Sequence, residues 1–365
     1  MLPAMSTTDE LSHTSDADST HTWLDDPPPL PSTPTPPQVH LSNHRTNYPH
    51  HSTKFHLNLS DCWGDELDDT PGFRLLYQNI NCIKSANDWQ HWTEISSNLF
   101  SHNFQCFGFA ETNIPWSPDH VSKLQSKLRR PTPINRQQAL LSTASSNEIS
   151  LSPTYQPGGT ATGLLGPWSG RAIQQISDPA GLGRWSGFSL VSSNNRQLHI
   201  ITAYRPCQHS ISNAGDETAY AQQFRILRTA SHSSPEPRQQ FLTDLGQQLQ
   251  QWSSSSHDII LMMDGNESIS NQGPLHRFVT QHNLIDAIAS KHGPHAPTTY
   301  SRGRQCIDYL FITPRLAPTI HKCGILPFAG PITISDHSGL WITFDSTTPG
   351  QTPSSTERRR IEDST

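Results

Sequence analysis

Six apolar segments of this 365-residue sequence each carry, at one end, polar side chains that could take part in chemistry. In HDIILMMDGNES, residues 257–268, the apolar run stops at Asp264, and Gly265 separates that carboxylate from the carboxamide of Asn266. Such a run is typical of a buried strand, and active sites are commonly built where strand ends meet at one edge of a sheet. The polar residues at segment ends are Asn79, Asn81, Glu111, Tyr204, Asp264, Asn266, Asp308, Asp336 and His337.

Side chains of these types can bind a hard divalent cation through oxygen atoms, and they can hold or move protons. Each of them also has a structural interpretation, because Asp and Asn favour the turns that end strands and an Asp-His pair can be one hydrogen bond. Taken singly, each residue fits the structural interpretation better. Their regular order at segment ends favours a shared site.

The segments that position these residues alternate between strand and helix patterns. Helical spacing of apolar residues predicts helices over 89–99, 241–249 and 275–282. Strands outnumber helices and several follow one another directly, which predicts an α/β domain with mixed sheets. The predicted strands are 73–77, 106–110, 160–165, 185–192, 198–204, 258–263, 307–313 and 340–344.

The remaining segments have the composition of solvated chain, since the sequence holds 30 prolines and only 33% hydrophobic residues. Residues 1–70 include PPPLPSTPTPP and predict a disordered acidic tail rich in Pro, Ser, Thr and His. We also predict a flexible surface insertion over 131–157 and a second disordered tail over 347–365. Residues 71–346 then form one folded domain.

The net charge of −6 is unevenly distributed along the chain. Residues 1–70 carry 11 acids and 2 bases, whereas residues 71–350 carry 17 acids and 20 bases. The acidity therefore belongs to the tail, and the folded part is mildly basic. A mildly basic domain is compatible with a polyanionic substrate such as nucleic acid.

Membrane and secretory classes are not indicated by the sequence. No apolar stretch approaches the roughly 18 residues of a membrane span, and the N-terminus MLPAMSTTDELS has no basic region followed by an apolar one. We expect an intracellular protein, nuclear or cytoplasmic, with no membrane partner. The six cysteines form no C-x-x-C pair and predict free thiols, and the 20 histidines lie mostly in polar surroundings where solvated side chains are the rule.

The ordered set N-x-N, ET, Y-x-P, D-x-N, IDY and SDH across residues 73–344 resembles the endonuclease/exonuclease/phosphatase family, which includes DNase I and the apurinic DNA-repair endonucleases. Within the family, the sequence is most similar to endonuclease domains of non-LTR retrotransposons. The blocks that carry this similarity are GGTATGLLGPWSGRA and TYSRGRQCIDYLFITPRL, followed by CGILPF and SDHSGL. The resemblance implies the DNase I-like fold, a four-layered sandwich of two mixed β-sheets packed face to face with helices outside.

The resemblance also implies hydrolysis of a phosphodiester with Mg²⁺, or with Mn²⁺ as the alternative ion. It implies that Glu111 is the principal metal ligand, that Asn79 lies close by, and that Asp336 serves a second metal site or a supporting role. Asp264 would act on the attacking water, as a base or by orienting it. The remaining implied roles are phosphate or water binding by Asn266, phosphate binding by Tyr204 and His337, and control of the His337 tautomer by Asp308.

The sequence D-G-N at residues 264–266 leads to two expectations about local structure. Asp264 and Asn266 are two positions apart, so their side chains would leave the same side of an extended backbone. Gly265 would let the backbone and the substrate approach closely, because it has no side chain.

Four further residues are expected to bind substrate. Arg205, Arg302 and Arg304 would clamp a nucleic-acid backbone. Asn81 stands where many family members have an acid, so it removes a formal charge near the metal. Cys207 stands where repair endonucleases have an asparagine, which puts substrate preference in doubt.

Three functions follow from these patterns. The first is a Mg²⁺-dependent DNA endonuclease of retroelement type that nicks one strand and leaves a 3′-hydroxyl. The second is another phosphoesterase of the same fold, acting on RNA, phosphoinositide or lipid headgroups. The third is a non-catalytic relic or interaction module, which the presence of the whole residue set disfavours. We expect a monomer that binds DNA.

Overall fold

The computed structural model of this chain describes residues 62–129, 138–148, 150–152, 154–191, 196–207, 217–230 and 235–345. The described residues lie within one compact unit. Most of the two predicted tails falls outside them. Residues 62–70 are an exception, because β1 (Trp63–Gly64) pairs with β12 (Ile320–Ile325). The prediction that the N-terminal tail extends to residue 70 is therefore wrong for this stretch.

Thirteen strands of the described chain form two sheets, both mixed. The seven-stranded sheet contains one parallel pair, β2 and β3, and the six-stranded sheet contains one parallel pair, β8 and β9; the other pairs are antiparallel. The first sheet has the order β1, β12, β13 (Leu340–Phe344), β2 (Phe73–Asn79), β3 (Cys106–Ala110), β5 (Thr160–Leu165), β4 (Ala139–Ala144). The second has the order β10 (Ile285–Asp286), β11 (Asp308–Ile312), β9 (Asp258–Asp264), β8 (Gln197–Tyr204), β7 (Trp185–Val191), β6 (Ala172–Ser177).

Side chains alternate between the two faces of each central strand, and both faces are apolar because each packs against another layer of the fold. Leu75 and Tyr77 of β2 belong to the core between the two sheets, whereas Leu76 between them belongs to the core under the helices. On β9, Met262 faces the other sheet and Leu261 faces the opposite layer. Strands buried on both faces read as continuous apolar runs, which is the pattern seen in the sequence.

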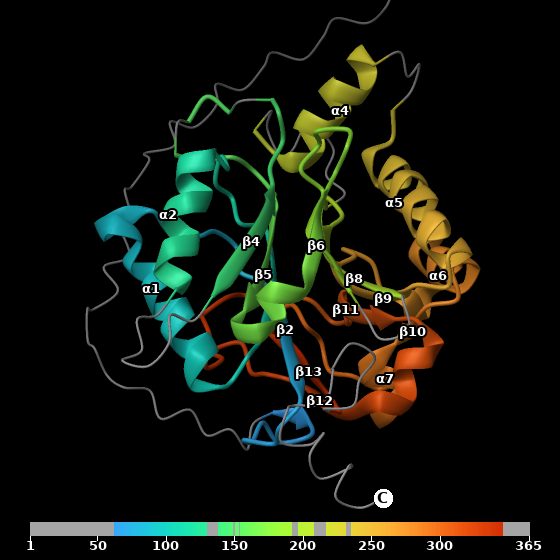
Figure 1. Cartoon of the computed structure of the whole chain (residues 1–365). Coiled ribbons are helices and arrows are strands. Elements are labelled where there is room, and N and C mark those ends of the chain that lie inside the picture. The colour runs from blue at the N-terminus through green and yellow to red at the C-terminus, as the bar shows by residue number, and fades with distance from the viewer. Residues whose placement is uncertain are drawn as a thin grey trace, which may run out of the picture. The chain divides into compact units, whose positions relative to one another are not determined.

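Helices cover the outer face of each sheet (Figure 1). Apolar residues of α1 (Ala86–Ser101) and α2 (Pro118–Leu128) pack on the first sheet, and those of α5 (Pro237–Ser254) and α6 (Pro274–Gln281) pack on the second. The order of layers is therefore helix, sheet, sheet, helix, which confirms the predicted sandwich. The shorter elements are α4 (Ala219–Thr229), α7 (Ala287–His292) and the 3-10 helices Gly166–Arg171, Ile269–Asn271 and Pro314–Thr319.

The two sheets approach each other closely at Gly108 of β3. A Cβ atom at this position would lie 2.4 Å from Oγ1 of Thr202 and 2.6 Å from Cε of Met262, which belong to β8 and β9 of the other sheet. Glycine is thus required here by the packing of the sheets and not by its backbone freedom.

The predicted insertion over 131–157 contains a strand that the sequence pattern did not reveal. β4 pairs with β5 along its whole length, and Leu141 of β4 is buried in the core under α1 and α2. The prediction of a flexible insertion is therefore wrong for residues 139–144, where a short apolar run is masked by polar neighbours. Residues 130–137, 149 and 153 of this region lie outside the described chain. None of the described helices is both long and apolar enough to cross a membrane.

Candidate active site

The strand register brings the polar segment ends to one edge of the two sheets. In the first sheet, Asn79 lies opposite Ala110, so that Glu111 follows directly beyond the neighbouring strand end. In the second sheet, Asp264 lies opposite Tyr204 on one side and opposite Asp308 on the other. Because β11 runs antiparallel to β9, the first residue of β11 meets the last residue of β9.

Hydrogen bonds join the two sheets at this edge. Asn79 donates from Nδ2 to Oδ2 of Asp264 over 2.8 Å, and the hydroxyl of Tyr77 lies 3.4 Å from Oδ1 of Asp308. Tyr204 of the second sheet is hydrogen-bonded to the carboxylate of Glu111 beyond the first sheet. We call this edge of the sandwich the catalytic edge, defined by Asn79, Asn81, Glu111, Tyr204, Asp264, Asn266, Asp308, Asp336 and His337.

Asp308 and His337 form a buried ion pair at the catalytic edge. Nδ1 of His337 donates to Oδ2 of Asp308 over 2.8 Å. Burial alone would lower the pKa of His337, but the negative charge of Asp308 and this hydrogen bond outweigh burial and raise the pKa to about 10. His337 is therefore an imidazolium at neutral pH, with Nε2–H as a second donor.

The carboxyl groups of the catalytic edge outnumber the positively charged side chains that pair with them. Burial raises the pKa of Asp264 to about 8, and the charge of Asp308 acts in the same direction. Burial likewise raises the pKa of Glu111, against the hydrogen bonds from Tyr204 and Asn79. Within the described chain, the only ion pair made by Glu111, Asp264 or Asp308 is that of Asp308 with His337.

The donor set at the catalytic edge fits a hard divalent cation. Asp264, Asp308 and His337 each bring a potential ligand atom within 4.8 Å of the others, although Asp308 and His337 are already bonded to each other. Glu111 adds a further carboxylate, while Asn79 donates from Nδ2 to Asp264 and accepts at Oδ1 from the N–H of Asn81 over 3.1 Å. Oxygen ligands with unbalanced negative charge are what Mg²⁺ and Mn²⁺ prefer.

Three of these residues, Asn81, Glu111 and Asn266, have a positive φ, and for Glu111 this conformation is uncommon. Glu111 has a φ of 49° and Asn81 has a φ of 44°, both in the left-handed region. Asn tolerates this region, but Glu seldom adopts it. The backbone bonds from Cys82 N–H to the carbonyl of Glu111 and from Ile83 N–H to the carbonyl of Thr112 hold the two turns against each other. Strain of this kind is characteristic of functional sites.

Asp336 lies at the exposed rim of the catalytic edge. Its carboxylate accepts from Nδ2 of Asn81 over 3.2 Å and from Arg302 over 3.1 Å. The negative charge of Asp336 also raises the pKa of Glu111 to a small extent, which places the two carboxylates in the same neighbourhood. The structure thus brings together all nine residues that the segment ends predicted.

The local geometry of Asn266 differs from the sequence expectation. β9 ends at Asp264, and Asn266 has a φ of 46°, so the backbone between the two residues is not extended. The N–H of Asn266 donates to Oδ1 of Asp264 over 2.8 Å, which makes an Asx turn, and its Nδ2 donates to the carbonyl of Arg205 over 2.8 Å. The two side chains are thus linked by a turn and not by strand periodicity.

Gly265 also owes its position to packing within the protein. A Cβ atom there would lie 2.5 Å from Cδ2 of Leu275, a fully buried residue of α6. The expectation that glycine is needed for the approach of substrate is therefore replaced by an internal cause: α6 packs directly on this turn.

Arg205 does not face the solvent and is not placed to clamp a substrate. Its guanidinium is 2.6 Å from Oε2 of Glu267 and also donates to the carbonyls of Gly265 and Arg238. Glu267 accepts in addition from the backbone N–H of Leu275 at the start of α6. The prediction that Arg205 binds substrate is wrong, because this arginine ties the turn after β9 to the protein interior.

Arg302 and Arg304 are both exposed, in the loop before β11. The side chain of Arg302 is 74% exposed and pairs with Asp336, so it lies at the rim of the catalytic edge. Both arginines thus remain available for contact with a polyanion.

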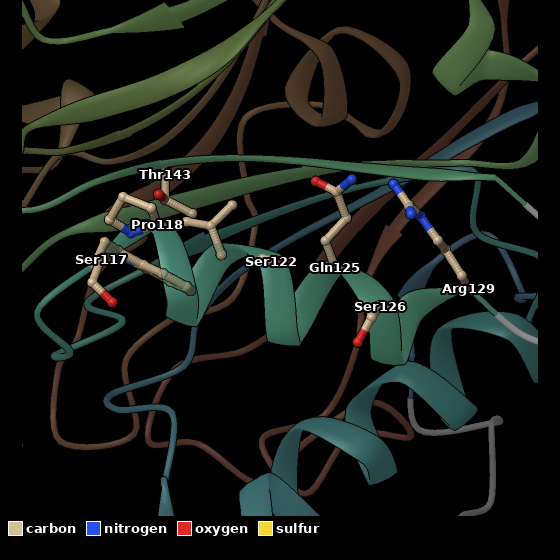
Figure 2. A pocket seen from close by; sticks show the side chains of 9 residues that line it. Ser117, Pro118, Ser122, Gln125, Ser126, Arg129 and Thr143 are labelled. Atoms are coloured by element: carbon tan, nitrogen blue, oxygen red, sulfur yellow. The ribbon is translucent and has the colours of Figure 1, made fainter.

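Hollows of about 560, 380 and 190 Å³ lie on the surface of the described chain outside the buried cluster. A small cavity of about 190 Å³ adjoins Glu111 and Tyr204 and is also lined by Asn113, Tyr155 and Tyr220, which the sequence patterns did not single out. A larger hollow of about 560 Å³ lies between α2 and the edge strand β4 (Figure 2), and none of its lining residues belongs to the catalytic edge. Only the smallest cavity is connected with the predicted chemistry.

A second cluster of potential metal ligands has a structural explanation. Asp65, His292 and Cys323 converge, but Asp65 already accepts from the N–H of Cys323 over 2.9 Å and pairs with Lys291 at 3.1 Å. Nε2 of His292 lies 3.0 Å from the carbonyl of Cys323. These bonds connect β1, α7 and β12.

Comparison with known proteins identifies the fold. No protein-family model and no curated protein sequence matches the chain. Among solved structures, the AP endonuclease LMAP from Leishmania major is 13% identical, with a TM-score of 0.51, over 76% of this chain and 89% of that chain. Two further structures are also similar. An AP endonuclease from Archaeoglobus fulgidus is 14% identical, with a TM-score of 0.48, over 75% of this chain and 99% of that chain. The 3′-5′ exonuclease NExo from Neisseria meningitidis is 13% identical, with a TM-score of 0.49, over 75% of this chain and 100% of that chain. The two mixed sheets flanked by helices are thus the DNase I-like fold of endonuclease/exonuclease/phosphatase proteins, as predicted from the sequence.

Proposed function

We propose that this chain is a divalent-metal-dependent phosphodiesterase that nicks one strand of DNA. The observation that carries the proposal is the cluster of Glu111, Asp264 and Asp308 at the catalytic edge, where two fully buried carboxylates and a partly buried one share a single imidazolium. Burying negative charge without partners is costly. A protein that retains such a cluster gains from it only when a cation and a reacting group complete the site.

In this proposal, Glu111 and Asn79 hold the cation, with Asp336 nearby in a supporting role. The bound cation would supply positive charge and Lewis acidity at the phosphoryl oxygens. Asn79 donates from Nδ2 to Asp264, and Tyr204 is hydrogen-bonded to Glu111, so both side chains are oriented before any substrate arrives. Mg²⁺ and Mn²⁺ are the ions that this donor set suits.

Asp264 would act on the attacking water, by orienting it or by accepting its proton. Its two oxygens accept from Nδ2 of Asn79 and from the N–H of Asn266, which fixes the plane of the carboxylate. A pKa raised towards the working pH suits a general base. The water oxygen would bond to phosphorus, the bond from phosphorus to the 3′ oxygen would break, and that oxygen would leave as a 3′-hydroxyl after protonation.

His337 and Tyr204 would bind the phosphate. Asp308 holds Nδ1 of His337, so the imidazolium has Nε2–H free to donate to a phosphoryl oxygen on which charge develops. The oxygen of Asn266 and the hydroxyl of Tyr204 are further polar groups at the same edge. Arg302 and Arg304 would contact the backbone of the nucleic acid from the exposed rim.

DNA as the substrate, and cleavage of retroelement type, are supported by the sequence blocks and not by the fold alone. GGTATGLLGPWSGRA and TYSRGRQCIDYLFITPRL are similar to retrotransposon endonuclease domains, and the structural neighbours named above include AP endonucleases. The same catalytic set also suits RNA or a small phosphoester, because it engages the phosphate and not the base. A non-catalytic module would have no use for the charge cluster.

A substrate panel tests the proposal. Purified protein with Mg²⁺ is incubated with labelled duplex DNA, labelled RNA, a phosphoinositide and a chromogenic phosphodiester. We expect nicks in DNA whose 3′ ends a DNA polymerase extends without further treatment. Cleavage of only RNA or only the phosphoinositide would show that the substrate is of that class and not DNA. No hydrolysis of any of the four compounds would favour a non-catalytic module.

A further inference from the structure

Tyr300 adjoins the catalytic edge and lies in the block TYSRGRQCIDYLFITPRL, but the sequence patterns gave it no role of its own. Its ring lies against the imidazole of His337, with ring centroids 4.8 Å apart and ring planes inclined by 38°. The guanidinium of Arg302 lies 5.1 Å from the centroid of the same Tyr300 ring. Tyr300 is thus the aromatic member of a stack that runs from the buried imidazole to the exposed rim.

The backbone around Tyr300 is tied to the segment that carries His337. Tyr300 and His337 form an antiparallel bridge, the N–H of Ser301 donates to the carbonyl of Asp336 over 2.8 Å, and the N–H of Ser338 donates to the carbonyl of Thr299 over 2.9 Å. The Tyr300 ring is therefore held on a paired segment and does not depend on a free loop.

The same segment also holds the partner of His337. Oγ1 of Thr299 accepts from the backbone N–H groups of Ile307 and Asp308, over 3.0 and 3.1 Å. The residues next to Tyr300 therefore position Asp308, while Tyr300 itself contacts His337. Both members of the ion pair are supported by one short stretch, Thr299–Ser301.

A single hydrogen bond does not fix an imidazole ring. The hydrogen bond from Nδ1 to Asp308 fixes the position of that one atom of His337. The ring can still tilt about this hydrogen bond, and a tilt would move Nε2. Contact with a flat aromatic face restricts the tilt, because the two rings pack against each other. Catalytic groups need supporting contacts of this kind to stay within a fraction of an ångström of the productive geometry.

We propose that Tyr300 is a positioning residue that fixes the plane of the His337 imidazolium, and thereby the direction of its Nε2–H, through its aromatic ring and not through its hydroxyl. This inference rests on the proposed function, since the direction of Nε2–H matters only if His337 donates to a phosphate. Tyr300 acts through His337 and not on the substrate.

Two substitutions separate the ring from the hydroxyl. Tyr300→Phe keeps the ring and removes only the hydroxyl, whereas Tyr300→Leu removes the ring and keeps an apolar side chain. In single-turnover nicking of supercoiled plasmid with Mg²⁺, we expect Tyr300→Leu to lower the maximal rate by about 10- to 100-fold, because a small misplacement of a reacting group has this effect. The enzyme concentration that gives half of this rate should change by less than about twofold, and Tyr300→Phe should resemble the wild type.

A second readout does not depend on activity. In protein labelled with ¹³C at histidine, the Hε1 resonance of His337 is assigned as the signal absent from a His337→Gln variant. It should shift in Tyr300→Leu, because the ring current of Tyr300 is lost, and should stay near its wild-type position in Tyr300→Phe. Thermal unfolding of each variant shows whether the fold is retained.

Each alternative result overturns the inference in a recognisable way. An unchanged maximal rate in Tyr300→Leu would show that the ring is not needed, and an equal loss in Tyr300→Phe would assign the effect to the hydroxyl. A change confined to the half-saturating concentration would make Tyr300 a substrate contact. If the wild type cleaves nothing, the proposed function fails, and an unchanged His337 resonance in Tyr300→Leu would separately reject the contact.

Discussion

At the scale of single residues, the carboxyl groups of the catalytic edge are arranged in a way that is unfavourable for folding. Asp264 and Asp308 are fully buried, and one imidazolium serves both of them and Glu111. Residues selected for folding alone would replace such carboxylates by neutral side chains. Activity and stability should therefore respond in opposite directions to mutation here.

Asp264→Asn should abolish catalysis and yet raise the melting temperature of the metal-free protein at pH 7. The folded pKa of Asp264, about 8, lies above the unfolded value of 3.8. Between these values the native state binds a proton that the unfolded state lacks, so stability falls as pH rises. Asparagine avoids this loss. The measurement is thermal unfolding in EDTA at pH 7 and again below pH 4, where the gain should vanish.

The matched control is Asp178→Asn, another buried carboxylate. Asp178 is bonded to the buried Arg184 at 2.7 and 2.9 Å, so its neutralisation should lower the melting temperature. A lower melting temperature for Asp264→Asn as well would contradict the charge imbalance inferred at the catalytic edge.

The pH dependence of cleavage should report the Asp308–His337 pair. Asp308 raises the pKa of His337 to about 10, so the protonated, active form is lost only as pH rises through that value. Asp308→Asn removes the charge that opposes desolvation and should move the alkaline limb of the rate profile to lower pH. The check is the rate of nicking from pH 6 to pH 10.5 for both proteins. An alkaline limb at the same pH in both would exclude His337 as the titrating donor.

At the scale of the elements, the sequence predicted the strands that carry the site better than the strands at the sheet edges. β9 is an unbroken apolar run buried on both faces, and its continuation into Asp264 predicted a strand end with a functional group. β4 was missed because it is a short edge strand among polar residues, and its pairing with β5 is a tertiary contact that no local pattern displays.

Side-chain direction was the part of the site that the sequence could not supply. Arg205 follows Tyr204 directly and was expected at the substrate, but it turns inward because it pairs with the carboxylate of Glu267, 62 positions away. The Asx turn at Asn266 and the stacking of Tyr300 on His337 likewise depend on contacts between distant segments. Residue type and order predicted which groups meet, and tertiary packing decided how they are held.

Arg205→Ala should destabilise the fold without acting on the substrate directly. It leaves the partly buried Glu267 with the backbone N–H of Leu275 and the longer contact to Arg238, at 3.6 Å, and loss of one partner of such a pair costs up to about 3 kcal/mol in unfolding free energy. Urea unfolding provides the measurement. The matched control is the exposed Arg304→Ala, which should leave stability unchanged and reduce the salt dependence of DNA binding by about one unit of slope. Equal stability of Arg205→Ala and the wild type would contradict the inward placement.

At the scale of the whole molecule, the site exists only because two separate sheets are held in one relative position. Asn79 and Asp264 belong to different sheets, and Tyr204 of the second sheet is bonded to Glu111 just beyond β3 of the first, so a shift between the sheets would separate these groups. The close approach at Gly108 is part of what sets this position.

Gly108→Ala should lower both stability and activity although it is remote from the chemistry. The added methyl group would meet Met262 and Thr202 of the other sheet, and overpacking of this kind costs about 1–3 kcal/mol. Gly170→Ala is the control, because a Cβ atom there meets nothing within 4 Å. Urea unfolding and nicking rates are compared for the two variants. Wild-type stability and rate in Gly108→Ala would show that the sheets adjust freely.

The central claim is that the catalytic edge hydrolyses phosphodiesters, and nicking of supercoiled plasmid tests it most directly. Purified full-length protein is incubated with plasmid in Mg²⁺ or in EDTA, beside a His337→Ala variant whose folding is verified by thermal unfolding. We expect conversion of supercoiled to open-circular DNA by the wild type with Mg²⁺, none in EDTA, and a rate at least about 100-fold lower for the variant. Nicking that persists in EDTA or in His337→Ala would contradict the account, and so would the absence of nicking by the wild type in either Mg²⁺ or Mn²⁺.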